Sequence, residues 1–296
     1  MIIDTHVHVW EIDPPRYPIG PTAPNWTSLP DEPGTADELL AEMDSHGVDW
    51  SVLVQTSWST WDNGYIADSV ARFPNRFVGM GLLDPLAANN AAQARYWVQE
   101  QGLVGFRFHP MYYPEQKVLL RPENEALWEE LAGLDAALQF HLRAAQADQL
   151  AAIASRYPHL RLIVDHMGYP EVTGDIFGSM AAFQPILDLA AHDNICFKLS
   201  DVKGRSQQPF PFADVHPFIH ALLDAFGTER TIWGTGYPGH HRTRHNWLSL
   251  ADELRLIQEG LPFLTPAQAD GILGDNAAEL FRLKTDDSTA KSLLSH

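Results

Sequence analysis

The sequence predicts a single (β/α)8 barrel, and three observations support that fold class. Eight short apolar runs recur along the chain, and most of them lack the polar alternation of a half-exposed strand. Helix-like stretches separate these runs. The alternation extends over roughly 250 residues, which is the usual size of such a barrel. An open doubly wound sheet is the alternative, but no glycine-rich phosphate turn follows the first run.

The eight runs rich in apolar and β-branched residues are expected to form the strands. We interpret them as buried on both faces, because polar residues do not alternate regularly with apolar ones. The predicted strands span residues 2–8, 50–57, 77–84, 103–110, 137–143, 161–168, 195–201 and 231–238.

Six segments between the strands are expected to form helices. The first begins with an N-cap residue, Thr35, and ends before Gly47, and the second ends before Gly102. The predicted helices span residues 35–46, 89–101, 123–134, 146–157, 179–192 and 213–226.

Four long loops follow the carboxyl ends of predicted strands, the face on which barrel enzymes build their active sites. They span residues 10–33, 110–122, 203–217 and 237–246, and the first is rich in proline. The sequence contains no internal repeat and no linker, so we expect one domain over residues 1–284. Residues 285–296 are polar without periodicity and are expected to form a frayed tail.

The composition favours a cytoplasmic enzyme that acts on a small molecule. The chain has 20 Lys and Arg against 38 Asp and Glu, and its formal net charge of −18 argues against nucleic-acid partners. A few local cations can still hold a small anionic substrate. The single Cys196 excludes a disulfide framework and a cysteine-based zinc cluster, and it indicates a reducing compartment. No apolar run reaches the ~18 residues of a membrane helix, no secretory signal is recognisable, and a homo-oligomer is compatible with the sequence.

Two histidines on the first predicted strand indicate a metal site. His6 and His8 are two residues apart, so in a strand both side chains point the same way, toward the barrel mouth. Two converging imidazoles suit a divalent ion such as zinc. The alternative for this pair alone is two core histidines with structural hydrogen bonds.

Polar residues at the same level of later strands strengthen the case for an active site. A packed barrel interior prefers Val, Ile or Leu, and a His or Lys buried there without partners costs several kcal/mol. The residues concerned are Arg107 and His109 on the fourth strand, His141 on the fifth, His166 on the sixth, and Lys198 with Ser200 on the seventh.

Taken in order, the strand motifs resemble the amidohydrolase superfamily, in the branch called amidohydrolase 2. The motifs are His-x-His on the first strand, Gly-Phe-Arg-Phe-His-Pro on the fourth, Asp-His-Met-Gly on the sixth, Lys-Leu-Ser on the seventh and Trp-Gly-x-x-Tyr-Pro on the eighth. The resemblance covers residues 1–283. The sixth and seventh motifs are most similar to the sugar-lactone and pyrone-dicarboxylate lactonases, in a branch that also contains nonoxidative decarboxylases and a hydratase.

The resemblance implies a hydrolase that opens a lactone or a related cyclic carbonyl compound by attack of an activated water. His6, His8 and His141 match the family's metal ligands, and His166 matches its sixth-strand histidine. One divalent metal, zinc by preference, is expected to be held weakly or not at all. A metal-dependent nonoxidative decarboxylase of an aromatic or unsaturated acid is one alternative, and an inactive or binding homologue is another.

Gly236 departs from the family pattern, because the family usually has an aspartate at this position of the eighth strand. Three explanations are open: the base has moved elsewhere, hydrolytic activity has been lost, or the position has been engineered. We favour the first, because His240, His241 and His245 in the next loop can supply a substitute base. Asp165 is a poor substitute, since it neighbours inward-facing His166 and should point outward.

Further residues are expected to line the substrate pocket. Arg107 suits a substrate carboxylate and Lys198 a developing oxyanion, although Lys198 could instead pair with Asp4. The rings of Trp58 and Tyr112 would contact a ring-shaped substrate, with packing under the long loops as the alternative. The predicted catalytic residues are His166, Lys198, His240 and His241, and the predicted substrate contacts are Arg107, His109, Trp58, Tyr112 and Ser200.

Overall fold

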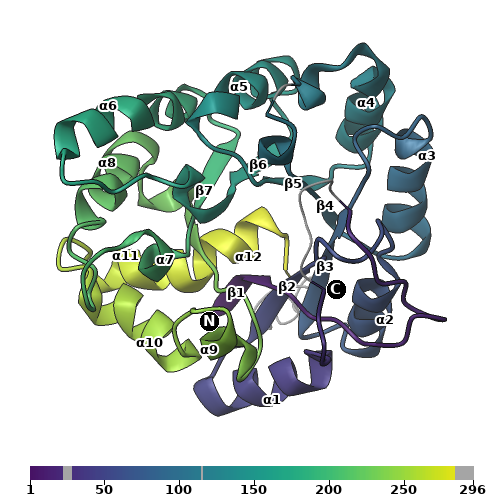
Figure 1. Ribbon diagram of the computed structural model, residues 1–296, viewed down its shortest axis with the longest axis horizontal. Coiled ribbons are helices and arrows are strands. Elements are labelled where there is room, and N and C mark those ends of the chain that lie inside the picture. Colours follow the sequence, from purple (N-terminus) through teal and green to yellow (C-terminus); the bar gives the residue numbers. More distant parts are fainter. Residues whose placement is uncertain (23–28, 115, 284–296) are drawn as a thin grey trace, which may run out of the picture.

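The chain folds into a ring of eight parallel strands, which confirms the predicted (β/α)8 barrel (Figure 1). The computed structural model describes residues 1–22, 29–114 and 116–283. Neighbouring strands pair in chain order. The strands are β1 (Ile3–Val7), β2 (Trp50–Val54), β3 (Phe77–Leu82), β4 (Gly105–Phe108), β5 (Ala137–Phe140), β6 (Arg161–Val164), β7 (Ile195–Leu199) and β8 (Thr231–Trp233).

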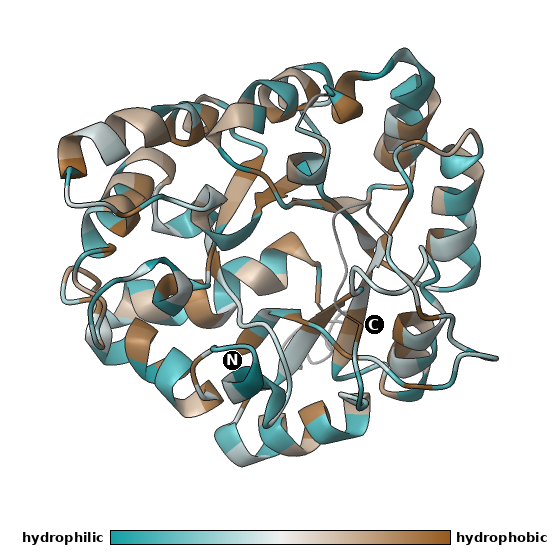
Figure 2. Ribbon diagram, in the orientation of Figure 1, coloured by the Kyte–Doolittle hydropathy of each residue, from teal (hydrophilic) through white to brown (hydrophobic). Residues whose placement is uncertain are grey.

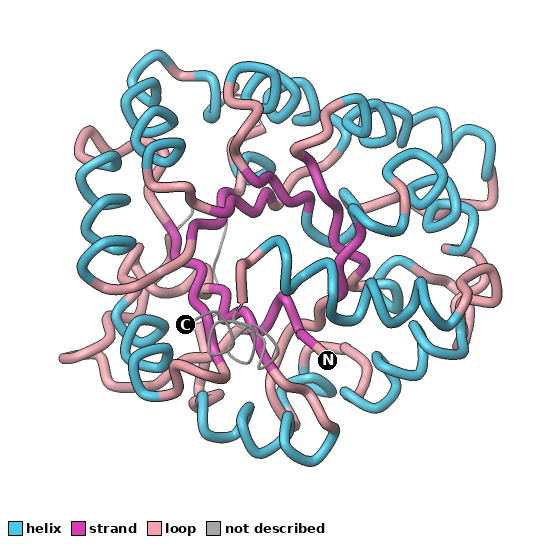
Figure 3. Tube along the Cα trace, turned by 180° about the vertical axis from the view of Figure 1, so that it is seen from behind, coloured by secondary structure: helices cyan, strands magenta, loops and turns pink. Residues whose placement is uncertain are grey.

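Helices surround the ring of strands (Figure 3). The predicted caps of the first helix are confirmed, because Thr35 accepts a hydrogen bond from Glu38 N and Gly47 is left-handed at φ 69°. Figure 2 shows hydrophilic and hydrophobic segments alternating along the helices, as expected where one face is buried. The longer helices are α1 (Ala36–His46), α2 (Gly64–Arg72), α3 (Asn90–Arg95), α4 (Glu125–Gly133), α5 (Ala147–Arg156), α6 (Ile176–Leu187), α8 (His216–Phe226) and α10 (Leu250–Arg255). The shorter helices are α7 (Val202–Arg205), α9 (His241–Arg244), α11 (Pro266–Asp270) and α12 (Asn276–Leu280).

Contacts outside the regular ladder join β1 to β8. Thr5 Oγ1 donates a hydrogen bond to Trp233 O at 2.6 Å, and His8 N donates one to Gly236 O at 2.8 Å. Apolar side chains of the strands fill the barrel and pack against α12, which leaves the carboxyl ends of the strands for the polar residues. The apolar cluster consists of Ile3, Val52, Val54, Met80, Ala137, Ile163 and Ile232 with Ala277 and Phe281.

The strands end earlier than the sequence predicts. β6 ends at Val164 rather than at residue 168, because His166 and Met167 adopt a left-handed backbone with φ of 49° and 57°. β8 ends at Trp233, so the rest of the predicted strand leaves the ladder. Helices α2, α7 and α9 to α12 were not predicted, and the predicted tail over 285–296 lies outside the described residues. Within 1–22, 29–114 and 116–283, no helix is both long and apolar enough to cross a membrane.

Candidate functional site

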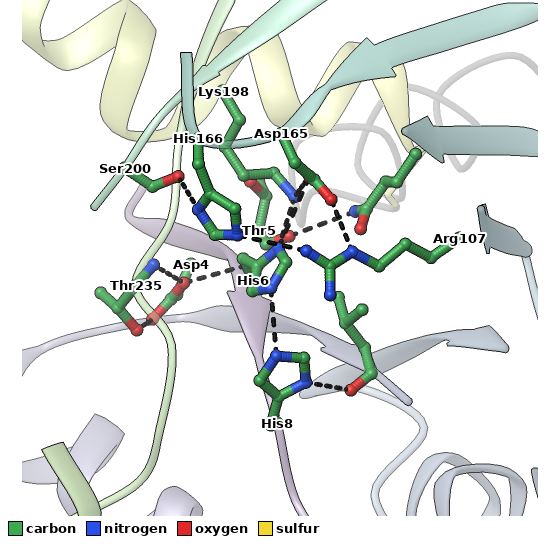
Figure 4. Close-up of polar contacts among 12 residues, drawn as sticks. Asp4, Thr5, His6, His8, Arg107, Asp165, His166, Lys198, Ser200 and Thr235 are labelled. Atoms are coloured by element: carbon green, nitrogen blue, oxygen red, sulfur yellow. Dashed lines mark hydrogen bonds and ion pairs between the residues drawn. The ribbon is translucent and has the colours of Figure 1, made fainter. Parts of the chain in front are cut away.

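The four histidines predicted to form a common centre lie next to one another. His6 Nε2 is 3.3 Å from His8 Nε2, at the carboxyl end of β1 (Figure 4). The ring centroids of His6 and His166 are 4.7 Å apart, and those of His141 and His166 are 5.9 Å apart. The structure therefore supports the inward orientation that the two-residue spacing and the strand positions predict.

Asp165 corrects one expectation, because its carboxylate points into the centre rather than outward. Its Oδ2 accepts a hydrogen bond from Arg107 Nε at 2.6 Å, and its Oδ1 accepts one from Lys198 Nζ at 2.9 Å (Figure 4). Strand alternation does not apply here, since β6 has already ended at Val164 and residues 165–168 form a tight turn. One buried carboxylate thus holds two buried cations.

The charges of this group are set by burial and by one another. Burial alone would raise the pKa of Asp165, but Lys198 and Arg107 hold that pKa well below its usual range. Burial lowers the pKa of Lys198 to about 8, against the opposing effect of Asp165. At neutral pH Lys198 and Arg107 are two cations beside the one carboxylate of Asp165, so these three side chains together carry one net positive charge.

Lys198 has a different partner from the one considered in the sequence. Asp4, the alternative, instead accepts hydrogen bonds from Thr235 N at 2.9 Å and Thr235 Oγ1 at 2.5 Å, and from His6 N at 3.1 Å. Asp4 therefore anchors the turn after β8 to β1. Lys198 is fully buried with two of its donors directed at Asp165 and His6, so its primary contacts are within the protein.

The contacts of Lys198 fix the tautomers of the two β1 histidines. Lys198 Nζ donates to His6 Nδ1 at 3.0 Å, which places the His6 proton on Nε2, from where it is donated to His8 Nε2. His8 Nδ1 in turn donates to Val54 O at 2.7 Å. Burial lowers the pKa of His6 well below its ordinary value and that of His8 to about 3. Both imidazoles are therefore neutral over the physiological range.

Both ring nitrogens of His166 are engaged. Arg107 Nη2 donates to His166 Nε2 at 3.2 Å, so His166 Nδ1 carries the proton and donates it to Ser200 Oγ at 2.9 Å. Burial holds the pKa of His166 well below its ordinary value. His166 thus orients Arg107, and Ser200, which was predicted to contact substrate, directly contacts His166.

Two further histidines have a buried ring nitrogen without a hydrogen-bond partner among the described residues. These atoms are His109 Nε2 and His141 Nδ1. The two rings lie 5.2 Å apart, and Tyr112 lies 5.0 Å from His109 and 5.4 Å from His141. Burial lowers the pKa of both histidines well below the ordinary value, so both are neutral. Neutral unpaired imidazoles can accept a proton or hydrogen-bond a ligand.

His240 and His241 are not brought to this centre. His240 bonds through Nε2 to Glu32 at 2.9 Å and through Nδ1 to Glu38 at 3.3 Å, and His241 Nε2 donates to Pro33 O at 2.9 Å. In the part of the chain that the structure describes, no hydrogen bond or ring contact joins either side chain to the four central histidines. The loop after β8 therefore offers no support for a base at these two positions.

Trp58 lines a separate outer pocket. This pocket has a volume of about 260 Å³ and lies beside Trp10 and Trp58, whose rings meet edge to face at 5.4 Å. Trp10 also contacts Tyr237, which lies 5.4 Å from the ring of His8. An aromatic chain thus connects the outer pocket to the centre.

Three aromatic residues at the centre were not identified from the sequence. Tyr169 lies 4.9 Å from the ring of His141, Tyr237 contacts His8, and Trp247 lies 5.8 Å from the ring of His166. Tyr169 directly follows the Asp-His-Met-Gly motif, and Tyr237 lies within the Trp-Gly-x-x-Tyr-Pro motif, so the sequence could have indicated both as site residues. Nothing in the sequence pattern marks Trp247.

The centre matches a metal ion in geometry but not in charge. The 3.3 Å between His6 Nε2 and His8 Nε2 fits two ligands of a tetrahedral zinc, for bonds of about 2.0–2.1 Å, and the contact of His8 Nδ1 with a carbonyl is typical of ligating histidines. His6, Asp165 and His166 also lie within reach of one ion. However, the atoms of His6, Asp165 and His166 that could bind an ion already accept hydrogen bonds from Lys198 and Arg107. These two cations also leave a net positive charge, which disfavours a further cation. These residues do not fit a tightly held divalent ion.

Comparisons with known proteins agree on the fold and on the general chemistry. A family model described as amidohydrolase matches residues 3–283. The chain is 25% identical over 286 residues to L-fucono-1,5-lactonase of Burkholderia ambifaria, with 95% of each chain covered. It is 27% identical over 289 residues to 4-sulfomuconolactone hydrolase of Rhizobium radiobacter, covering 94% of this chain and 89% of that one. An amidohydrolase structure from Burkholderia multivorans with bound zinc has a TM-score of 0.74 at 20% identity, covering 96% of this chain and 100% of the other.

Proposed function

Because the chain belongs to the amidohydrolase family, we propose that it opens a lactone ring by adding water to the ring carbonyl. Two relatives that match nearly its whole length are a lactonase and a lactone hydrolase. The observation that carries the proposal is the pairing of a fixed Arg107 guanidinium with two neutral imidazoles, His109 and His141, whose ring nitrogens are unpaired within the described residues. The guanidinium suits stabilisation of the oxyanion that forms in acyl transfer, and the two imidazoles suit the proton transfers.

In the proposed reaction, His141 is the general base. Its ring adjoins those of His109, His166 and Tyr169, so a water between it and the substrate carbonyl lies at the middle of the group. His141 takes the proton of the water while the water oxygen bonds to the carbonyl carbon. The ring C–O bond then breaks, and the leaving oxygen takes the proton back from His141, which gives a hydroxy acid or its keto form.

Arg107 stabilises the negative charge that develops on the carbonyl oxygen. Its Nε and Nη2 are committed to Asp165 and His166, and no hydrogen bond among the described residues uses Nη1. Nη1 is therefore the donor assigned to the oxyanion. Asp165 and His166 act as positioning residues, because they fix the guanidinium plane before substrate arrives. This division of roles requires no carboxylate at Gly236 and no step through a metal, which is proposed to be weakly held or absent.

The proposed substrate is a lactone that carries a carboxylate or sulfonate. The two cations of the centre exceed its one carboxylate, and an anionic substrate group would offset the remaining charge. The relative that hydrolyses 4-sulfomuconolactone acts on such a compound. His109 Nε2 and Tyr112 are proposed to contact the substrate ring, since both adjoin His141.

Arg107→Lys should raise KM and lower kcat together. A lysine keeps the charge but has one nitrogen, which cannot contact Asp165, His166 and the substrate in the fixed directions of a guanidinium. We expect a loss in kcat/KM of about 10²-fold or more, in the range seen when one oxyanion donor is removed. Steady-state kinetics on a carboxylated lactone measure this. Arg95→Lys, at an exposed ion pair with Glu130 on the outer helices, is the matched control and should change neither constant.

The rate should fall as pH rises through about 8. The pKa of Lys198 is lowered to about 8, so its charge is present below that pH and lost above it, whereas the central histidines are already neutral. Loss of the charge removes the cation that pairs with Asp165, and the neutral amine, which can accept as well as donate, no longer fixes the His6 tautomer. A profile of kcat/KM from pH 6 to 10, corrected for spontaneous lactone hydrolysis, checks this. A rate that rises through pH 8 would mean that the neutral amine is the active form.

A panel of lactones with product analysis tests the proposed function. The panel contains 2-pyrone-4,6-dicarboxylate, 4-sulfomuconolactone and L-fucono-1,5-lactone, each followed by acid release and by carbon dioxide release. New carboxylic acid without carbon dioxide supports the hydrolase. Carbon dioxide release supports the decarboxylase alternative. Binding without turnover of any compound supports an inactive homologue.

A further inference from the structure

We infer that Trp247 is a specificity-determining residue that contacts the substrate ring and occupies the position of the missing strand-8 carboxylate. The inference rests on the proposed lactone hydrolysis and adds to it the shape of the substrate. The indole of Trp247 packs on Gly236 and forms one wall of the centre. That wall favours a flat, unsaturated lactone ring over a sugar lactone.

Gly236 is a glycine because the indole lies against it. A Cβ atom at Gly236 would lie 2.9 Å from both ring-fusion carbons of Trp247, Cδ2 and Cε2, and 3.0 Å from Cζ2. Real Cβ atoms do not come that close to other heavy atoms. The backbone does not require glycine there, because Gly236 is absent from the positive-φ glycines of the described chain. The side-chain space of residue 236 is therefore filled by Trp247.

The loop after β8 carries Trp247 back to the end of that strand. Helix α9 ends at Arg244, and Asn246 then adopts a left-handed backbone at φ 61°, which an asparagine tolerates better than most residues. Trp247 N donates to Arg242 O at 2.7 Å, so the reversal is held by a backbone hydrogen bond. The position of the indole is thus built into the loop.

The indole is placed to contact a bound ligand. Trp247 lies 5.8 Å from the ring of His166 and 6.1 Å from that of Tyr237, meeting both edge to face. It is only half-buried, although both neighbouring rings belong to the centre. The part of the indole that neither Gly236 nor these rings cover is available for stacking against a planar substrate.

Several polar side chains near the indole are already committed to contacts within the protein. Asp165 already accepts from two cations, Ser200 from His166, and Thr235 donates to Asp4. Hydroxyl groups of a sugar lactone that face the indole would find no hydrogen-bond partner on its ring face, and a buried unpaired hydroxyl is costly. A planar ring with anionic substituents buries no unpaired hydroxyl group when it stacks against the indole face.

The kinetic test compares Trp247→Ala and Trp247→Phe with the wild type on 2-pyrone-4,6-dicarboxylate and L-fucono-1,5-lactone. We expect Trp247→Ala to raise KM for the pyrone about tenfold, with kcat changed by less than about threefold, since the aromatic contact holds the bound ring and takes no part in the bond changes. Trp247→Phe should restore most of the loss, and the KM for the sugar lactone should change less. Trp50→Phe, at the start of β2 and the other end of the barrel, is the matched control.

A stability cycle tests the packing without any substrate. Gly236→Ala and Gly236→Asp should each lower Tm in the wild type, because the added atoms meet the indole. In the Trp247→Ala background the same changes should lower Tm by less than half as much. Equal destabilisation in both backgrounds would overturn the claim that Trp247 fills the position of the carboxylate.

The outcomes separate this inference from the proposed function. Hydrolysis with an unchanged KM for the pyrone in Trp247→Ala would overturn the inference and leave the hydrolase intact. If the wild type hydrolyses no lactone, the proposed function fails, and calorimetric Kd values for 2-pyrone-4,6-dicarboxylate are compared instead of KM. Weaker binding by Trp247→Ala that Trp247→Phe restores would still support the contact between Trp247 and the ring. Absence of binding to the wild type would overturn both.

Discussion

Replacing Asp165 by asparagine should lower the free energy of unfolding by about 3–5 kcal/mol, the range for breaking a buried ion pair by removing one partner. The amide cannot neutralise Lys198 and Arg107, both of which stay buried at the centre of the barrel. Burial would then favour loss of the Lys198 proton, and the tautomer of His6 would no longer be fixed. Activity should fall with stability, because Arg107 loses the contact that holds its guanidinium.

Denaturant unfolding of Asp165→Asn measures the effect. Asp68→Asn is the matched control, because Asp68 also accepts from a cation and a second donor, Arg16 and Tyr17, but on the surface. Exposed ion pairs contribute about 0–1 kcal/mol, so the control should lose little. An Asp165→Asn variant as stable as the control would show that charge attraction does not stabilise the buried group of Asp165, Lys198 and Arg107.

Replacing His141 by asparagine should lower kcat by about 10²–10⁴-fold, the usual contribution of a general base. The amide stands near the position of Nδ1 and keeps a polar group there, but it cannot accept a proton at neutral pH. The fold should persist, since that nitrogen has no hydrogen-bond partner among the described residues. Single-turnover measurements on a carboxylated lactone isolate the chemical step.

Two variants accompany His141→Asn. His220→Asn, on the exposed face of α8 beside Asp224, controls for the loss of a histidine and should leave kcat unchanged. His109→Asn should mainly raise KM, because His109 is assigned to substrate contact. Full activity in His141→Asn, with the large loss of kcat in His109→Asn, would show that His109 is the general base and that His141 is not.

The barrel could be predicted from the sequence because buried parallel strands leave continuous apolar runs. All eight runs became strands, but their carboxyl ends were placed too late. The residues that extend the predicted strands, such as Asp165 and His166 after β6, belong to the site and leave the ladder in tight turns. Strand alternation predicted the convergence of His6, within β1, and His8, directly after it, and failed for Asp165, which stands in the tight turn after β6.

The loop residues of the site could not be predicted in the same way. His240 and His241 looked suitable as bases, yet they contact the segment after β1 through Glu32 and Pro33. Trp247 contributes to the centre because Asn246 reverses the chain, and neither the reversal nor its direction follows from local pattern. The missing aspartate at Gly236 was visible in the sequence, whereas the indole that occupies its space was not.

The central claim is that this site hydrolyses an anionic lactone without a strand-8 carboxylate and without a tightly held metal. The most direct measurement is the reaction of 2-pyrone-4,6-dicarboxylate with chelator-treated protein of measured metal content, in water labelled with heavy oxygen. We predict the ring-opened acid with one labelled oxygen per molecule, no carbon dioxide, and a rate within about twofold of the untreated protein. Release of carbon dioxide, or a rate that follows the zinc content, would contradict the account.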